Sequence, residues 1–116
     1  MILGVGTDIE DVDRFRKLTY RKRKDFYDKI FTKREIKYCL QYNDPYPHFA
    51  VRFSAKEAII KALGVQIGFR DIEVLHDKGG APKIFIKGYK KSKLEYLVSL
   101  SHTRKMALSI VIAVSL

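Results

Sequence analysis

Two acidic residues have the chemical type and the setting of ligands for a hard metal ion. Glu57 lies one helical step from Phe53 and Ile60, at the edge of an apolar stripe where a lone charge is costly. Asp8 comes at the end of an apolar, strand-like segment over residues 2–9. Mg²⁺ commonly takes one or two protein carboxylates and completes its shell with water and substrate phosphates. The pair therefore suits a magnesium site, provided that the fold brings the two residues together.

Each acid also has an alternative interpretation. Lys61 follows Glu57 by four residues, so the two side chains suit a structural ion pair on a helix. The other possibility makes Glu57 a metal ligand or base and Lys61 a phosphate contact or acid. For Asp8, local sequence favours a helix cap over a metal ligand. The spacing of these residues along the chain does not decide between the structural and the functional role of either acid.

A third group of residues that could take part in binding or catalysis is expected in a turn over residues 101–105. His102 lies there beside Thr103 and Arg104, whose hydroxyl, backbone and cationic groups suit a phosphate. A single histidine in a turn can also be merely exposed. The chain has no Walker loop, dinucleotide fingerprint or His-x-x-x-His zinc motif.

The charge of the chain is unevenly placed. The formal net charge is +10, and residues 14–34 contain ten basic and two acidic residues, whereas residues 1–13 contain four acids and no base. Such a block is either a solvated helical face or a docking patch for a strongly negative partner. Nucleic acid, an anionic membrane and an acidic protein all fit the charge.

The elements expected to position these groups begin with a strand and continue with helices. Thr32 and Glu35 form a capping box, and Gly64 suits the end of a long central helix. We expect a strand over 2–9, one or two short helices over 11–29, a helix after Thr32, a break over 43–47 and the central helix from near His48 to Leu63. Small and apolar residues nearly surround that last helix, which predicts that it is buried.

The remainder of the chain is typical of antiparallel strands. Segments 72–76 and 83–87 flank a turn, and alternation marks strands over 94–100 and 106–114. The order predicts an α+β fold with one domain over 1–116. The single Cys39 excludes an internal disulfide framework, and neither a membrane span nor a signal peptide is present in the sequence. We therefore expect an intracellular protein.

Three segments together resemble the holo-[acyl-carrier-protein] synthases, the small 4′-phosphopantetheinyl transferases. They are the strand motif over residues 4–10, the helix motif Arg-Phe-Ser-Ala-Lys-Glu-Ala over 52–58 with its continuation to Gly64, and the Ser-Leu-Ser-His-Thr motif over 99–103. The helix motif is highly specific, and the resemblance extends over nearly the whole chain. One departure is Ala81, which stands where many members have a basic residue before the proline of the hairpin turn.

The resemblance implies transfer of the phosphopantetheine arm of coenzyme A to a serine of apo-acyl carrier protein, with Mg²⁺ and release of adenosine 3′,5′-bisphosphate. It places the metal on Asp8 and Glu57 and the catalytic groups on Glu57 and Lys61. The cofactor-binding residues implied are Arg52, Lys56, Lys61, Gly64, His102 and Thr103. The implied docking site for the carrier protein consists of Arg14, Lys17, Arg21, Lys22, Arg23 and Lys24.

The resemblance further implies a cytoplasmic homotrimer with active sites at its subunit interfaces. Two other classes of function fit the basic charge, namely a nucleic-acid-binding protein and a non-catalytic module that binds an acidic protein. Neither gives a role to Asp8 or Glu57. The motifs therefore favour the transferase, with no nucleic acid as partner.

Overall fold

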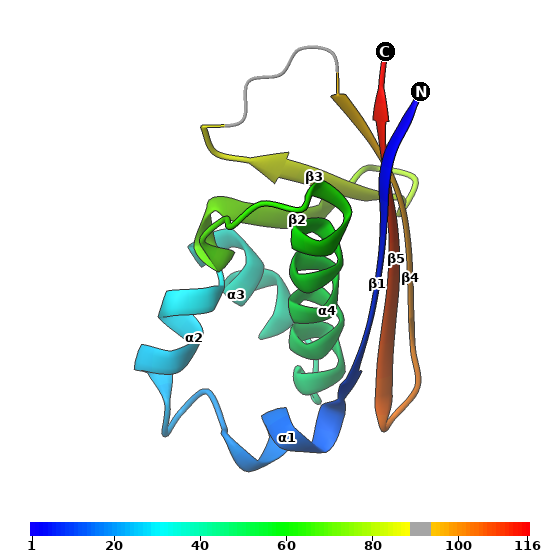
Figure 1. The fold of residues 1–116 in the computed structure, drawn as a ribbon. Coiled ribbons are helices and arrows are strands. Elements are labelled where there is room, and N and C mark those ends of the chain that lie inside the picture. Colours follow the sequence, from blue (N-terminus) through cyan, green and yellow to red (C-terminus); the bar gives the residue numbers. More distant parts are fainter. Residues whose placement is uncertain (89–93) are drawn as a thin grey trace.

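An N-terminal strand, a series of helices and then antiparallel strands follow one another, which confirms the α+β class (Figure 1). The computed structural model describes residues 1–88 and 94–116. Its elements are β1 (Ile2–Asp11), α1 (Val12–Lys17), α2 (Lys24–Ile30), α3 (Lys33–Cys39), α4 (Tyr46–Leu63), the 3₁₀ helix η1 (Phe69–Asp71), β2 (Ile72–His76), β3 (Pro82–Ile86), β4 (Leu94–His102) and β5 (Met106–Ser115). Within the described ranges, no helix combines the length and hydropathy needed to cross a membrane.

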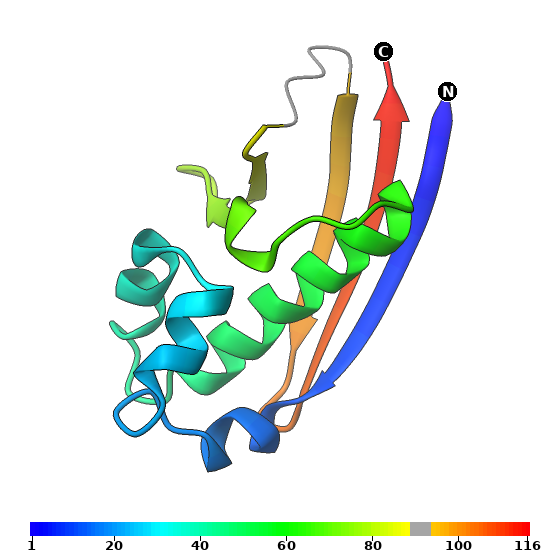
Figure 2. The ribbon, with the colours of Figure 1, turned by 60° about the vertical axis from the view of Figure 1, so that its left-hand side comes forward.

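The strands form two antiparallel sheets around α4. One sheet has the order β1-β5-β4, and α4 lies against one of its faces (Figures 1 and 2). The other sheet is the hairpin of β2 and β3, beside the C-terminal half of α4. Helices α1 to α3 pack around the N-terminal half. This central position makes α4 the scaffold of the molecule.

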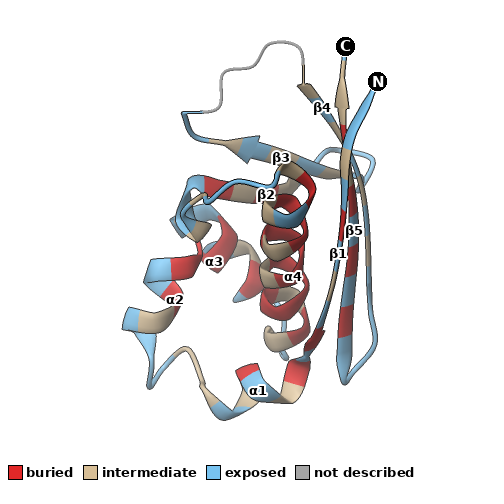
Figure 3. Cartoon of the chain, viewed as in Figure 1, coloured by how far each residue is buried: buried red, intermediate tan, exposed pale blue. Residues whose placement is uncertain are grey.

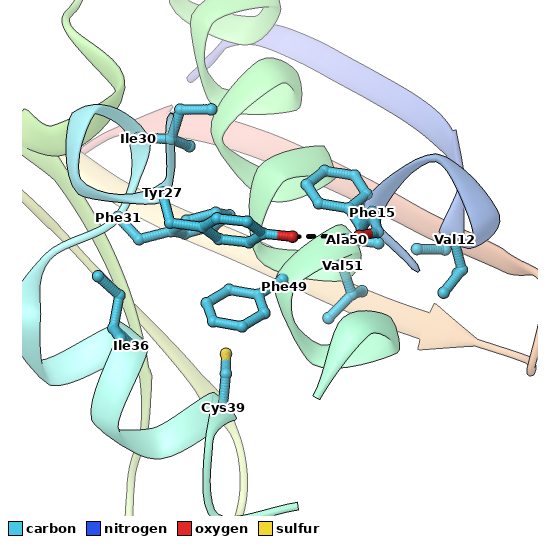
Figure 4. Packing of buried hydrophobic residues seen from close by; sticks show 11 residues of the cluster. Val12, Phe15, Tyr27, Ile30, Phe31, Ile36, Cys39, Phe49, Ala50 and Val51 are labelled. Carbon is cyan, nitrogen blue, oxygen red and sulfur yellow. Dashed lines mark hydrogen bonds between the residues drawn. The ribbon is translucent and has the colours of Figure 1, made fainter. Parts of the chain in front are cut away.

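Burial on several sides of α4 agrees with its predicted place in the core (Figure 3). Near its N-terminus, Phe49 packs with Tyr27 and Phe31, whose ring centroids lie 4.7 and 5.0 Å from its own (Figure 4). The Tyr27 hydroxyl donates to the Leu18 carbonyl at 2.6 Å, so its polar atom is satisfied inside this aromatic cluster. Alanines on the other half of α4 pack against β2 and β5.

Two glycines allow β1 to approach α4 unusually closely. A Cβ atom added at Gly4 would collide with the backbone carbonyl of Ala62, and one at Gly6 with that of Ala58. Side chains of alternate strand residues point to the same face, so Asp8 faces α4 as well. The glycines therefore determine how near Asp8 lies to the helix.

The predicted helix ends are confirmed. Thr32 and Glu35 form the reciprocal capping box, and Gly64 ends α4 in the left-handed conformation with φ 67° and ψ 24°. The helix α4 begins two residues earlier than predicted, at Tyr46, because Pro47 fits the first turn, where no backbone donor is needed.

The ends of β1 and β4 also differ from the sequence-based expectation. Strand β1 continues to Asp11, so Asp8 lies within the strand opposite Ser109, and the interpretation of Asp8 as a helix cap is wrong. The cap of α1 is Asp11, whose carboxylate accepts from the Asp13 amide at 2.9 Å. Strand β4 extends through His102, which leaves only residues 103–105 for the turn. In both cases pairing with β5 prolongs the strand beyond its apolar pattern.

Candidate active site

The structure brings Asp8 of β1 beside Glu57 of α4. The Ser54 hydroxyl donates to the Asp8 backbone carbonyl at 3.0 Å, and Lys61 Nζ lies 3.6 Å from Asp8 Oδ1. Residues 54, 57 and 61 are spaced by three and four positions, so they share one face of the helix. Since Asp8 contacts the residues on both sides of Glu57 along this face, the two acids lie at the same level of the β1–α4 contact.

A third carboxyl group, that of Glu10, belongs to the same region. Burial, a hydrogen bond with Asp8 and the negative charges of Asp8 and Glu57 raise the pKa of Glu10 to about 8, while Arg14 opposes the rise. The sequence-based reasoning did not select Glu10. The signal was available, because strand alternation places residues 8 and 10 on one face.

The acidic groups fit a hard divalent cation. Asp8 Oδ2 is buried without a hydrogen-bond partner, and only 10% of the Asp8 side chain is exposed. An unpaired buried carboxylate oxygen is costly, and a cation would satisfy it. Over residues 1–88 and 94–116, no group of three or more His, Cys, Asp or Glu side chains forms a metal site by itself. Asp8 and Glu57 as the only protein ligands agree with the usual Mg²⁺ shell of water and phosphate.

Lys61 contacts β1 and not Glu57. Its ammonium group donates to the Thr7 carbonyl at 3.1 Å in addition to its contact with Asp8, and 56% of its side chain is exposed. In the described part of the chain no ion pair involves Glu57, so the structural Glu57–Lys61 pair is not formed. Lys61 is therefore an exposed cation at the rim of the acidic group, open to a ligand.

Lys56 has a structural role, which differs from the phosphate contact expected for it. Its side chain is fully buried, and Nζ donates to Glu35 Oε1 and the Ile30 carbonyl at 2.7 Å and to the Phe69 carbonyl at 3.0 Å. All three ammonium hydrogens are thereby used. Burial lowers the pKa of Lys56 and the charge of Glu35 opposes this change. No donor is left for coenzyme A.

Arg52 is a buried cation that lacks a negative partner. It is 1% exposed, Nη1 donates to the His48 carbonyl at 3.2 Å, and Nη2 lies 3.2 Å from His76 Nδ1. The guanidinium carbon lies 4.2 Å from the centre of the Tyr38 ring. Nε is buried without a partner, and no carboxylate of the described residues pairs with Arg52. Such a cation suits an anionic ligand.

The remaining predicted cofactor residues lie towards the two ends of α4. The His102 ring is 5.2 Å from that of His48, near the N-terminal end, and the Thr103 hydroxyl accepts from the Met106 amide at 3.0 Å. Gly64 ends the helix, and its amide donates to the Ile60 carbonyl. Positions 52 and 64 are about 18 Å apart along the helix axis. A ligand that reached all of them would have to be long.

The basic residues proposed for docking are exposed on α1, on the segment after it and at the start of α2. Arg16 is different, because its guanidinium binds Asp13 at 2.7 Å and Asp44 at 2.6 Å and so joins α1 to the segment before α4. A small pocket of about 100 Å³ separates the basic surface from the acidic group. It is lined by Glu10, Arg14, Phe15, Leu18, Phe26 and Phe53.

The outer face of the three-stranded sheet carries exposed apolar side chains. Ile9 is 60% and Leu108 50% exposed, and these two residues pair across β1 and β5. The other members of this outer face include Leu3, Val5, Leu97 and Ile110. A hollow lined by Thr7, Asp8, Ile9, Lys61 and Leu108 joins the apolar face to the acidic group. An apolar patch of this kind is typical of a protein interface.

Comparison with known proteins gives one family. The family model described as "4'-phosphopantetheinyl transferase superfamily" matches residues 4–112. A holo-[acyl-carrier-protein] synthase of Thermodesulfovibrio yellowstonii is 40% identical over 114 residues, which cover 97% of this chain and 98% of that protein. A protein of the same name from Chlamydia caviae is 41% identical over 115 residues, 93% of each chain.

Solved structures agree with this result over the whole fold. A holo-[acyl-carrier-protein] synthase from Neisseria meningitidis has a TM-score of 0.86 and 31% identity, with 99% of this chain and all of that chain covered. One from Bacillus anthracis, in complex with "CoA (3',5'-ADP)", has a TM-score of 0.85 and 30% identity, with 100% and 99% covered.

Proposed function

Because the chain belongs to the 4′-phosphopantetheinyl transferase superfamily, we propose that it is a holo-[acyl-carrier-protein] synthase acting on coenzyme A and apo-acyl carrier protein. The observation that carries the proposal is the buried, unpartnered Asp8 Oδ2, on a residue that contacts Ser54 and Lys61 on either side of Glu57 along α4. We place the protein in the cytoplasm, since its one cysteine, Cys39, is a free buried thiol.

In the proposed reaction, a serine hydroxyl of the carrier attacks the phosphorus atom nearest to pantetheine. Asp8 and Glu57 would hold Mg²⁺, which supplies neutralisation of charge on the pyrophosphate. Glu57, directly or through a water, accepts the serine proton as the new P–O bond forms. The exposed ammonium of Lys61 stabilises the phosphate of the leaving adenosine 3′,5′-bisphosphate.

Coenzyme A would extend along α4 from its N-terminal half, near Arg52 and His102, towards Gly64. The unpaired cation of Arg52, with His102 and Thr103 nearby, suits the phosphates of the nucleotide half. Lys61, which lies beside Asp8, and Gly64, which ends the helix, are towards the other end of α4. The spread of these groups over about 18 Å of helix agrees with a long, phosphate-bearing substrate.

The proposed function is tested by intact-mass spectrometry of the carrier. Incubation with this protein, coenzyme A and Mg²⁺ is expected to add one phosphopantetheine to apo-carrier, and EDTA is expected to prevent the addition. An unchanged carrier mass with several carriers at saturating coenzyme A would contradict the proposal. Salt-sensitive binding to a polynucleotide, together with that result, would support the nucleic-acid alternative.

The exposed basic surface is proposed to dock the acidic carrier protein. Arg14 is 73% exposed and lies next to the apolar pocket, so charge pairing on this surface directs the carrier towards Glu57. Reversal of Arg14, Arg21 and Arg23 to Glu is expected to raise the KM for carrier at least tenfold and to leave the KM for coenzyme A within about twofold. Steady-state kinetics with each substrate varied in turn measure both values. An equal rise in both would contradict the docking role.

The apolar outer face of the sheet is proposed to form the interface of a homotrimer. Leu108 is 50% exposed there and also lines the hollow beside Asp8 and Lys61, so a second copy would complete the active site. Leu108→Lys would place a charge in this contact, and we expect it to yield monomers with little transfer activity. Light scattering after size exclusion gives the mass of each form. Trimers of undiminished stability in the variant would contradict this interface.

A further inference from the structure

One of the groups that contact the Arg52 side chain is free to move away from it. Tyr38 and the His48 carbonyl belong to packed helices, whereas His76 is an exposed residue at the end of β2. Arginine has no acceptor atom, so His76 Nδ1 must accept from Arg52 Nη2 over the 3.2 Å that separates them. The imidazole of His76 is therefore neutral in this contact, with its proton on Nε2.

We propose that His76 accepts a hydrogen bond from Arg52 in the free protein. When coenzyme A binds, a phosphate group of coenzyme A takes the place of His76 at Arg52, and His76 takes up a proton from solvent. The proposal rests on the proposed function, because it takes coenzyme A as the ligand of Arg52. It accounts for a cation that is 1% exposed, has no acidic partner among residues 1–88 and 94–116, and has an unpartnered Nε. One hydrogen bond of Arg52, to imidazole, is exchanged for one to a phosphate oxygen.

The ionisable groups around His76 determine the direction of its proton exchange. Burial and the charge of Arg52 lower the pKa of His76, and Asp77 in the following turn opposes this change. Tyr38 of α3 stacks on the imidazole at 5.4 Å, and His48 of α4 acts from further away. A phosphate bound at Arg52 adds an anion beside the imidazole and offsets the charge of the guanidinium, which raises the pKa of His76 and favours imidazolium.

Two substitutions separate the parts of the proposal. In His76→Asn the amide oxygen still accepts from Arg52 but does not titrate. In His76→Ala the acceptor is absent and Arg52 is open to solvent. At pH 8 we expect His76→Ala to bind coenzyme A about three- to tenfold more tightly than the unchanged protein, because no hydrogen bond to imidazole has to be broken.

Calorimetry with coenzyme A alone, without carrier, measures both effects. Titrations near pH 6.5 in buffers of different ionisation enthalpy give the number of protons taken up. We expect a fraction of a proton for the unchanged protein and a clearly smaller uptake for His76→Asn. Equal uptake in both, or weaker binding by His76→Ala at pH 8, would overturn the inference while leaving the proposed function intact. Failure of the unchanged protein to bind coenzyme A and adenosine 3′,5′-bisphosphate would overturn both.

A measurement on the free protein tests the starting contact without any ligand. Two-bond ¹H–¹⁵N correlation of the His76 imidazole at pH 8 is expected to show the proton on Nε2 and an unprotonated Nδ1. A proton on Nδ1 would show that His76 does not accept from Arg52, and it would overturn the inference independently of coenzyme A binding.

Discussion

Asp8→Asn and Glu57→Gln are each expected to lower the rate of phosphopantetheine transfer by about a thousandfold without unfolding the protein. Both changes keep the shape of the side chain and remove the charge proposed to hold Mg²⁺. Loss of several kcal/mol of charge stabilisation in the transition state corresponds to a rate loss of this order. The measurement is the initial rate of carrier conversion by intact-mass spectrometry over a range of Mg²⁺ concentrations.

The same variants are expected to be as stable as the unchanged protein, or more stable, in the absence of metal. The negative charges of Asp8 and Glu57 both act on Glu10, so removal of either charge relieves repulsion in this group. Asp11→Asn is a matched control, because it lies on the same strand in an exposed position and Asn serves equally well as a helix cap. Full activity of Asp8→Asn at limiting Mg²⁺ would contradict the metal assignment.

Lys56→Met is expected to remove about 3–5 kcal/mol from the free energy of unfolding. The substitution leaves Glu35 as a buried carboxylate without its cation, in a site where both side chains are 0% exposed. It also leaves the carbonyls of Ile30 and Phe69 without the Lys56 donor. Because Glu35 also accepts from the Val74 amide at 2.9 Å, the pair ties α3, α4 and β2 together. Urea denaturation followed by circular dichroism measures the loss.

Lys61→Met is the matched control for this prediction, because it makes the same change five residues further along α4. Because Lys61 is exposed, we expect the free energy of unfolding of the Lys61→Met protein to change by less than about 0.5 kcal/mol, while its transfer activity falls. We therefore expect Lys56→Met to lower mainly the stability of the protein and Lys61→Met to lower mainly its activity. If the Lys56→Met protein had normal stability but bound coenzyme A more weakly, the structural role of Lys56 would be wrong and the phosphate contact expected from the sequence would be supported.

Local patterns along the chain were sufficient to predict the order of the elements. The capping box at Thr32, the glycine at position 64 and the alternation in β4 and β5 each act over a few residues. The motif residues Asp8 and Glu57 were also found in this way, together with a family resemblance. Even so, Asp8 was assigned to the end of its strand, because pairing with β5 is not a local property.

Tertiary structure alone decided which charged groups are free to act. Lys56 and Lys61 lie on different faces of one helix, and helix spacing does not say which face is buried; one is fully buried against Glu35 and the other is exposed beside Asp8. The contact of Arg52 with His76 joins residues 24 positions apart, and that of Glu35 with Val74 joins residues 39 apart. Burial and pairing depend on such distant neighbours, and they set the pKa and availability of each side chain. For this reason the sequence determined the elements and the candidate residues, whereas the packing of α4 determined which of them face a ligand.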